Sequence, residues 1–158
     1  MQKIDLLVSH RQIQLWSRDF DDTLCQWGKK NLEQGAVIHK DVAILDPIID
    51  ESFGANIILE LSKGFSPDST AERIIVFPLF IHDKNKVEIS SVSEAFKVEI
   101  GLEEGYYRVY YEICEGGEDE EVYYKLTFVP ESQEFFPRFI ISDDWGGREN
   151  QPLSIGYC

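Results

Sequence analysis

Histidines, cysteines and paired carboxylates are the side chains of this sequence that could do chemistry. Catalysis would need a nucleophile with a base and an orienting group, or two carboxylates in one cleft. The three histidines, His10, His39 and His82, fall in separate predicted turns or strand ends, without the H-x-x-x-H or H-E-x-x-H spacing of a metal site. Cys25 has no CxxC partner and no nearby histidine, which favours a buried structural thiol. The sequence therefore predicts a protein that is not an enzyme and holds no metal or cofactor.

The most regular pattern is a pair of aromatic runs, Tyr106 to Cys114 and Val122 to Val129, joined by a Gly-Gly turn. Both runs are rich in Tyr, Val, Ile and Phe and alternate in residue type, which predicts a β-hairpin. Successive side chains of a strand point to opposite faces, so one alternating set should face the core. That inward set comprises Tyr107, Val109, Tyr111, Ile113, Val122, Tyr124, Leu126 and Phe128.

The outward side of this hairpin and its acidic turn form the candidate binding surface. Aromatic anchors ringed by charge are typical of protein–protein hot spots, and negative charge steers a basic partner. A later acidic loop is included in the surface. The candidate partner-binding residues are Tyr106, Tyr110, Tyr123, Glu112, Glu115, Glu118, Asp119, Glu120, Glu121, Asp143 and Asp144. The alternative is that the tyrosines make ordinary cross-strand contacts and that the acidic turn is only solvated.

Composition narrows the class of partner. The chain has 29 acidic and 15 basic residues and a formal net charge of −14. Phosphate contacts need Lys and Arg, so this balance argues against direct binding of nucleic acid and favours a basic protein, unless it serves solubility alone. Three cysteines without paired spacing indicate reduced thiols and a cytoplasmic location. The first ten residues resemble neither a signal peptide nor a membrane span.

The pattern of short apolar runs along the sequence predicts a mainly β fold, whose strands would position the candidate residues. About nine or ten short strands at close spacing, with no βαβ rhythm, are typical of an antiparallel β-sandwich. Residues 1–158 form a single domain in this interpretation, with an irregular C-terminal tail over 143–158. Pro78 lacks an N–H, so its strand should have an edge or a bulge at that point.

One α-helix is predicted over about residues 23–34. Asp22 is its expected N-cap, and Gly35 is placed to end it in a left-handed turn. Leu24, Trp27 and Leu32 recur at near-helical spacing. Gly28 weakens the helix, so docking of Leu24 and Trp27 on a sheet should stabilise it.

The layout resembles the competence protein J family, whose members inhibit a DNA-entry nuclease. The similar segments are the acidic approach and helix through Trp27, Leu32 and Gly35, then DVAILD (41–46), RIIVFP (73–78), VEISS (87–91) and EGYYRVYY (104–111). They cover most of residues 1–129, and the stretch from Ser132 to Cys158 is longer than the family pattern. The resemblance implies a nuclease partner whose DNA-binding cleft is occluded, with carboxylates in place of DNA phosphates.

Two other functions compete with this one. A β-sandwich that binds a small ligand or carbohydrate would use Trp16, Trp145 and tyrosines as a stacking platform. An enzyme would need two carboxylates, or a carboxylate and a histidine, converging in a cleft. The sequence alone does not define the oligomeric state.

Overall fold

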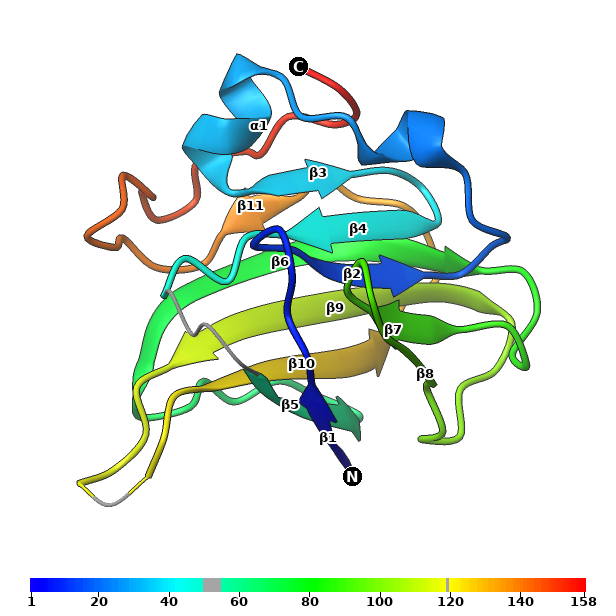
Figure 1. The fold of residues 1–158 in the computed structure, drawn as a ribbon, viewed down its shortest axis with the longest axis horizontal. Helices are drawn as coiled ribbons and strands as arrows, with labels where there is room; N and C mark the ends of the chain where they lie inside the picture. Colours follow the sequence, from blue (N-terminus) through cyan, green and yellow to red (C-terminus); the bar gives the residue numbers. More distant parts are fainter. Residues whose placement is uncertain (50–54, 119) are drawn as a thin grey trace.

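The computed structural model describes residues 1–49, 55–118 and 120–158, which form two β-sheets, one short helix and a 3₁₀ turn (Figure 1). The strands are β1 (Gln2–Leu6), β2 (Ile13–Trp16), β3 (Ala36–Ile38), β4 (Val42–Leu45), β5 (Ala55–Leu61), β6 (Ala71–Ile81), β7 (Glu88–Ser90), β8 (Ala95–Lys97), β9 (Gly105–Cys114), β10 (Tyr123–Pro130) and β11 (Arg138–Phe139). The larger sheet has the order β1-β5-β10-β9-β6-β11 and the smaller sheet β3-β4-β2-β7-β8. The prediction of a mainly β fold is confirmed.

Among the strands of the described residues, pairing is antiparallel with one exception, which lies in the larger sheet. Strands β5 and β10 run parallel, with Tyr124 opposite Ile57. The predicted hairpin is formed by β9 and β10, which pair antiparallel from Tyr123 opposite Cys114 to Pro130 opposite Tyr107. Strand β10 therefore lies between β9 and β5, and the hairpin occupies the middle of the larger sheet.

The hydrophobic core lies between the two sheets and takes side chains from both. Leu15 of β2 and Ile89 of β7 belong to the same buried cluster as Phe77 of β6, Val109 of β9 and Leu126 of β10. The inward set predicted for the hairpin is buried as expected, except that Val122 is only partly buried against the core. Strand alternation in the sequence was thus sufficient to identify the core face of the hairpin.

Pro78 lies in a part of β6 that is paired on one side only, which agrees with the prediction of an edge at that point. On one side β6 pairs with β9 along its length, and on the other β11 reaches only Ile75 and Val76. Pro78 is in phase with Phe80, whose N–H donates to the carbonyl of Lys40 rather than to β9. Within the described ranges, the missing N–H of Pro78 therefore faces the side of β6 that β11 does not reach.

The predicted helix is wrong in its extent. A 3₁₀ turn, η1 (Asp22–Cys25), and helix α1 (Lys29–Gln34) are separated by Gln26 to Gly28. Asp21, not Asp22, caps η1, because its carboxylate accepts a hydrogen bond from the backbone of Thr23. Gly28 is extended and is the N-cap of α1, outside the helix itself, which agrees with its poor helix propensity. Gly35 ends α1 in a left-handed conformation, as predicted (φ 76°).

The face that α1 buries is polar. Leu24 and Trp27 pack on the outer side of the smaller sheet as expected, but Leu32 is exposed, whereas Asn31 and Gln34 are buried. These two side chains bind the backbone of the tail. Asn31 accepts from the N–H of Cys158, and Gln34 exchanges hydrogen bonds with Ser154. The helix therefore docks on the C-terminal tail, and the spacing of the apolar residues in the sequence carries no information about this contact.

Candidate functional site

The turn between β9 and β10 carries acidic residues to one end of the larger sheet, and projects from the body of the protein at the lower left of Figure 1. Glu115, Glu118, Glu120 and Glu121 are exposed there, while Asp119 lies outside the described residues. The Glu121 carboxylate accepts a hydrogen bond from the Asn56 side chain at 3.2 Å. The turn is therefore a predominantly acidic projection, as the sequence predicted.

Glu72 of β6 and Asp144 of the loop after β11 extend this acidic region. The pKa of Glu72 is raised by a hydrogen bond with the Glu115 carboxyl, by loss of hydration, and by repulsion from Glu115 and Asp144. The carboxyl group of Glu72 therefore interacts with those of Glu115 and Asp144. We call the set Glu72, Glu115, Glu118, Glu120, Glu121 and Asp144 the acidic end.

Glu72 was not among the predicted site residues. Its place follows from strand pairing, because the neighbouring Ala71 lies opposite Cys114, the residue before Glu115. The sequence gives no signal for the register between β6 and β9, so Glu72 had no visible connection to the hairpin turn.

A groove of about 650 Å³ lies beside the turn, between it and the edge formed by β1 and β5. Tyr123 lies in its lining with Glu120 and Glu121, so three predicted residues do meet around one concave surface. The residues lining the groove are Lys3, Ile4, Asp5, Asn56, Ile57, Ile58, Glu120, Glu121 and Tyr123. Its volume is in the range of ligand and side-chain pockets, and acids outnumber bases in its lining.

Glu112 was predicted to face a partner, and this is wrong because its side chain is fully buried (0% exposed). The loop from Ser62 to Thr70 covers it: the backbone N–H of Asp68 donates to Glu112 Oε2 at 2.7 Å. Glu112 Oε1 is buried, and no group in the part of the chain that the structure describes forms a hydrogen bond with it. Burial raises the pKa of Glu112, although the Asp68 N–H opposes this shift. Glu112 therefore fixes the loop to the sheet and is not available to a partner.

The same loop covers two of the predicted tyrosines. The Tyr123 hydroxyl donates to the Asp68 carboxylate, and the Tyr110 ring stacks on Phe65 with centroids 3.8 Å apart. Burial and the bond to Asp68 raise the pKa of Tyr123 to about 12. Both tyrosines remain only partly exposed.

Tyr106 does not join the acidic end. It packs edge-on against Phe80 with ring centroids 4.8 Å apart. Tyr106 lies nine positions before Glu115 in the sequence, which corresponds to about 30 Å of extended strand. The predicted surface of tyrosines and acids is therefore not continuous.

Asp143 was also predicted to lie in the interface, and this is wrong for a similar reason. Its carboxylate is fully buried in an ion pair with Arg73 at 2.8 Å. Its neighbour Asp144 is exposed and belongs to the acidic end. The two adjacent acids thus have different roles, one structural and one on the surface.

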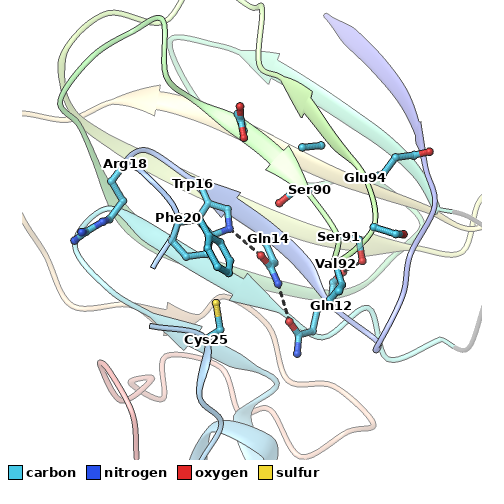
Figure 2. A pocket seen from close by; sticks show the side chains of 13 residues that line it. Gln12, Gln14, Trp16, Arg18, Phe20, Cys25, Ser90, Ser91, Val92 and Glu94 are labelled. Atoms are coloured by element: carbon cyan, nitrogen blue, oxygen red, sulfur yellow. Dashed lines mark hydrogen bonds between the residues drawn. The ribbon is translucent and has the colours of Figure 1, made fainter. Parts of the chain in front are cut away.

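A second groove, of about 430 Å³, lies on the outer face of the smaller sheet (Figure 2). Trp16 lies in its floor and packs against Phe20 on its wall, with ring centroids 5.1 Å apart. Trp145 is elsewhere, stacked over Arg73 at 5.8 Å. The aromatic platform expected of a carbohydrate-binding protein, with Trp16, Trp145 and tyrosines together, is therefore not assembled.

The residues considered for catalysis are dispersed. His39 Nε2 contacts the carbonyl of Leu24 at 3.0 Å, and His82 Nε2 contacts Asp41 at 2.9 Å. Burial raises the pKa of Cys114 to about 12, which disfavours a thiolate. Within 1–49, 55–118 and 120–158, no three His, Cys, Asp or Glu side chains are arranged to hold a metal ion. In these same ranges, no helix has the length and apolar character needed to cross a bilayer.

The fold and these surfaces define a small acidic β-sandwich protein of a known structural type. Its fold matches the crystal structure of ComJ, inhibitor of the DNA degrading activity of NucA, from Bacillus subtilis, with a TM-score of 0.66 and 16% identity over 83% of this chain and 96% of that one. Among curated proteins, none matches this chain. The model of the family Competence protein J (ComJ) matches residues 5–129. The chain therefore belongs to the ComJ family.

Proposed function

We propose that this protein binds and inhibits a nuclease, and that the acidic end enters the basic cleft where the nuclease holds DNA. The observation that carries the proposal is membership of the ComJ family over residues 5–129, together with the fold shared with the inhibitor of NucA. An inhibitor of this kind acts by occupying a surface, so it needs no catalytic group of its own.

The chemistry of the acidic end suits that role. A cleft that binds DNA phosphates presents Lys and Arg side chains, and carboxylates form charge-assisted hydrogen bonds with the same groups. The net charge of −14 would also steer the two proteins together over distances of about a Debye length, roughly 10 Å at 0.1 M salt.

Glu72 adds an energetic reason for a cationic partner. In the free protein a hydrogen bond with Glu115, loss of hydration, and repulsion from Glu115 and Asp144 raise the pKa of Glu72 and so disfavour its ionised form. A Lys or Arg side chain placed among these three carboxylates would relieve that repulsion. Binding would therefore be favoured by contacts in the complex and by relief of repulsion that exists before binding.

The proposal includes a cytoplasmic location. It is supported by the three cysteines, Cys25, Cys114 and Cys158, which are all free thiols. Fractionation of the native host with an antibody to the protein tests this point directly.

The test of the function compares two triple variants that remove equal charge. The first variant alters the acidic end by Glu118→Gln, Glu120→Gln and Glu121→Gln. The second alters exposed acids of another loop by Glu99→Gln, Glu103→Gln and Glu104→Gln. The probe is the nuclease of the same host that is most similar to NucA, assayed for DNA degradation and for association rate at low and high salt. The first triple should slow association by about tenfold at low salt and flatten its salt dependence. Equal rates for the two triples would remove the acidic end from the interface, and wild-type protein that leaves the nuclease fully active would overturn the function itself.

A further inference from the structure

We propose that the groove of Figure 2 is a second contact surface of the inhibitor, which receives an extended basic segment of the nuclease with an apolar side chain against Phe20. This inference rests on the proposed function. It concerns the outer face of the smaller sheet, and thus a different surface from the acidic end on the larger sheet.

Phe20 is the anchor of this surface. Its ring is 70% exposed although it packs against the nearly buried Trp16. Val92, at 57% exposure, also lines the groove and lies beyond Gln14 from Phe20 in Figure 2. Large apolar side chains left in water beside a concave floor are typical of interaction sites.

The floor of the groove is polar and already ordered. The Trp16 indole N–H donates to Gln14 Oε1, and Gln14 Nε2 donates to Gln12 Oε1, both at 2.8 Å (Figure 2). Gln14 and Ser90 are almost fully buried at the base. A fixed row of amides and a hydroxyl matches the peptide groups of an extended chain, and little side-chain entropy is lost when such a row binds.

The charges around the groove favour a basic occupant. Glu88 and Glu94 are in its lining. Asp19, which precedes Phe20, is 90% exposed and lies 4.0 Å from the ammonium group of Lys86. Arg18 is the basic residue of the lining, and it lies 4.0 Å from the carboxylates of both Asp21 and Asp41. The positive charge of Arg18 is thus balanced by Asp21 and Asp41, and that of Lys86 by Asp19, so Glu88 and Glu94 are the acids of the lining that a basic partner would meet.

The length of the surface favours a polypeptide over a small molecule. A neighbouring depression of about 440 Å³ is lined by His10, Arg11, Gln12, Trp27, Leu32 and Asp46. Gln12 borders both depressions. The exposed Leu32 lines this neighbouring depression and therefore continues the surface beyond the groove.

The experiment compares Phe20→Ala with Phe136→Ala, which removes a ring of similar exposure (74%) that lies outside the groove. Val92→Lys is a second variant that places a positive charge on the groove wall. The probe is again the host nuclease most similar to NucA, and the readouts are its Kd by calorimetry, inhibition of DNA degradation and the Tm of each variant. Phe20→Ala and Val92→Lys should each weaken binding by at least about tenfold with unchanged Tm, and Phe136→Ala should bind as wild type does.

Each remaining outcome counts against the proposal in a distinct way. The second surface alone is overturned under two conditions. The wild type binds the nuclease and the acidic-end triple variant binds it more weakly, and Phe20→Ala has the same affinity as the wild type or as Phe136→Ala. If cellotetraose or chitotetraose quenches Trp16 fluorescence while Phe20→Ala still inhibits, the groove is a saccharide site. If the wild type binds no such nuclease, both this inference and the proposed function fail.

Discussion

Arg73 and Asp143 form a two-point ion pair from which solvent is excluded. Arg73 Nε and Nη2 donate to the two Asp143 carboxylate oxygens at 2.8 and 3.0 Å, and the side chains are 3% and 0% exposed. Arg73 Nη1 also donates to the carbonyl of Gln34. The backbone N–H groups of Trp145 and Gly147 donate to Asp143 Oδ1. One ion pair therefore joins β6, the end of α1 and the tail.

Replacing Asp143 by Ala should destabilise the protein strongly, because it leaves the Arg73 guanidinium buried without its counter-charge. Removal of one partner from a buried pair costs about 3–5 kcal/mol. Urea unfolding monitored by tryptophan fluorescence measures the loss. Lys29→Ala breaks the exposed pair with Glu33 and should change stability by only about 0.5 kcal/mol. Equal effects of the two variants would contradict the structural role of Asp143.

The pH dependence of the Asp143 contribution has a defined sign. Burial would raise the pKa of Asp143, but the hydrogen bonds and charge of Arg73 and the N–H groups of Gly147 and Trp145 outweigh it and lower the pKa. A lowered carboxyl pKa stabilises the fold above the unfolded value of about 3.9, and this contribution is lost as pH falls through the folded value. The stability difference between wild type and Asp143→Ala should therefore shrink when unfolding is measured below about pH 4.

Glu112 should have the opposite pH dependence, because its pKa is raised by burial. The folded state then holds a proton that the unfolded state releases, so wild-type stability should fall as pH rises from about 4.3 through the raised pKa, by at most about 1.4 kcal/mol per pH unit. Glu112→Gln keeps the shape without the titration. Unfolding free energies across this window should show the variant gaining on wild type as pH rises.

The control for this prediction is Glu99→Gln, which alters an exposed carboxyl. Its stability should follow the wild-type pH profile. If Glu112→Gln also follows that profile, the Glu112 carboxyl is ionised at no cost in the fold, and its place in a closed, dry contact with the Ser62–Thr70 loop is contradicted.

The hairpin was predictable because its information is local. Alternation in residues 106–114 and 122–129 was sufficient to assign Tyr107 and Tyr124 to the core, and two glycines marked the turn. Exposure of Glu118 and Glu121 followed from the same local pattern.

What failed depended on contacts between distant residues. Alternation placed Glu112 on the outer face of its strand correctly, but it carries no information about the loop at Asp68 that covers that face. Asp143 and Asp144 look equivalent in sequence, and only the position of Arg73 separates them. Phe20, inside an acidic run, has no periodic apolar partner that would mark it as a surface anchor.

Glu72 gives the proposed inhibitor a proton-linked affinity. Its raised pKa means that a cationic partner at the acidic end must bind the ionised form, so the protein releases a proton on binding as pH approaches that pKa. Nuclease affinity should therefore weaken as pH falls from neutral toward about 4.5, partly because Glu72 becomes protonated. Glu72→Gln should bind less tightly at pH 7 and show a flatter pH profile. Calorimetry in buffers of different ionisation heat measures the proton release.

The matched variant for Glu72 is Glu134→Gln, which removes one exposed charge elsewhere. It should leave the pH profile of the wild type unchanged. If the affinity of Glu72→Gln changes with pH as that of the wild type does, Glu72 is not in the interface. That result concerns Glu72 alone and not the other residues of the acidic end.

Gly28 is expected to control how the tail docks on α1. The backbone N–H groups of Lys30 and Asn31 donate to the carbonyl of Cys158, and a Cβ added at Gly28 would collide with that carbonyl. The φ of Gly28, −92°, suits alanine, so Gly28→Ala should act through this collision and not through backbone strain. Alkylation of Cys158 by iodoacetamide, followed by peptide mass spectrometry, should become several-fold faster, and the amides of Lys30 and Asn31 should exchange faster. Gly64→Ala is the control, because its Cβ would meet no atom of the described residues within 4 Å. Equal Cys158 reactivity in the two variants would contradict the contact.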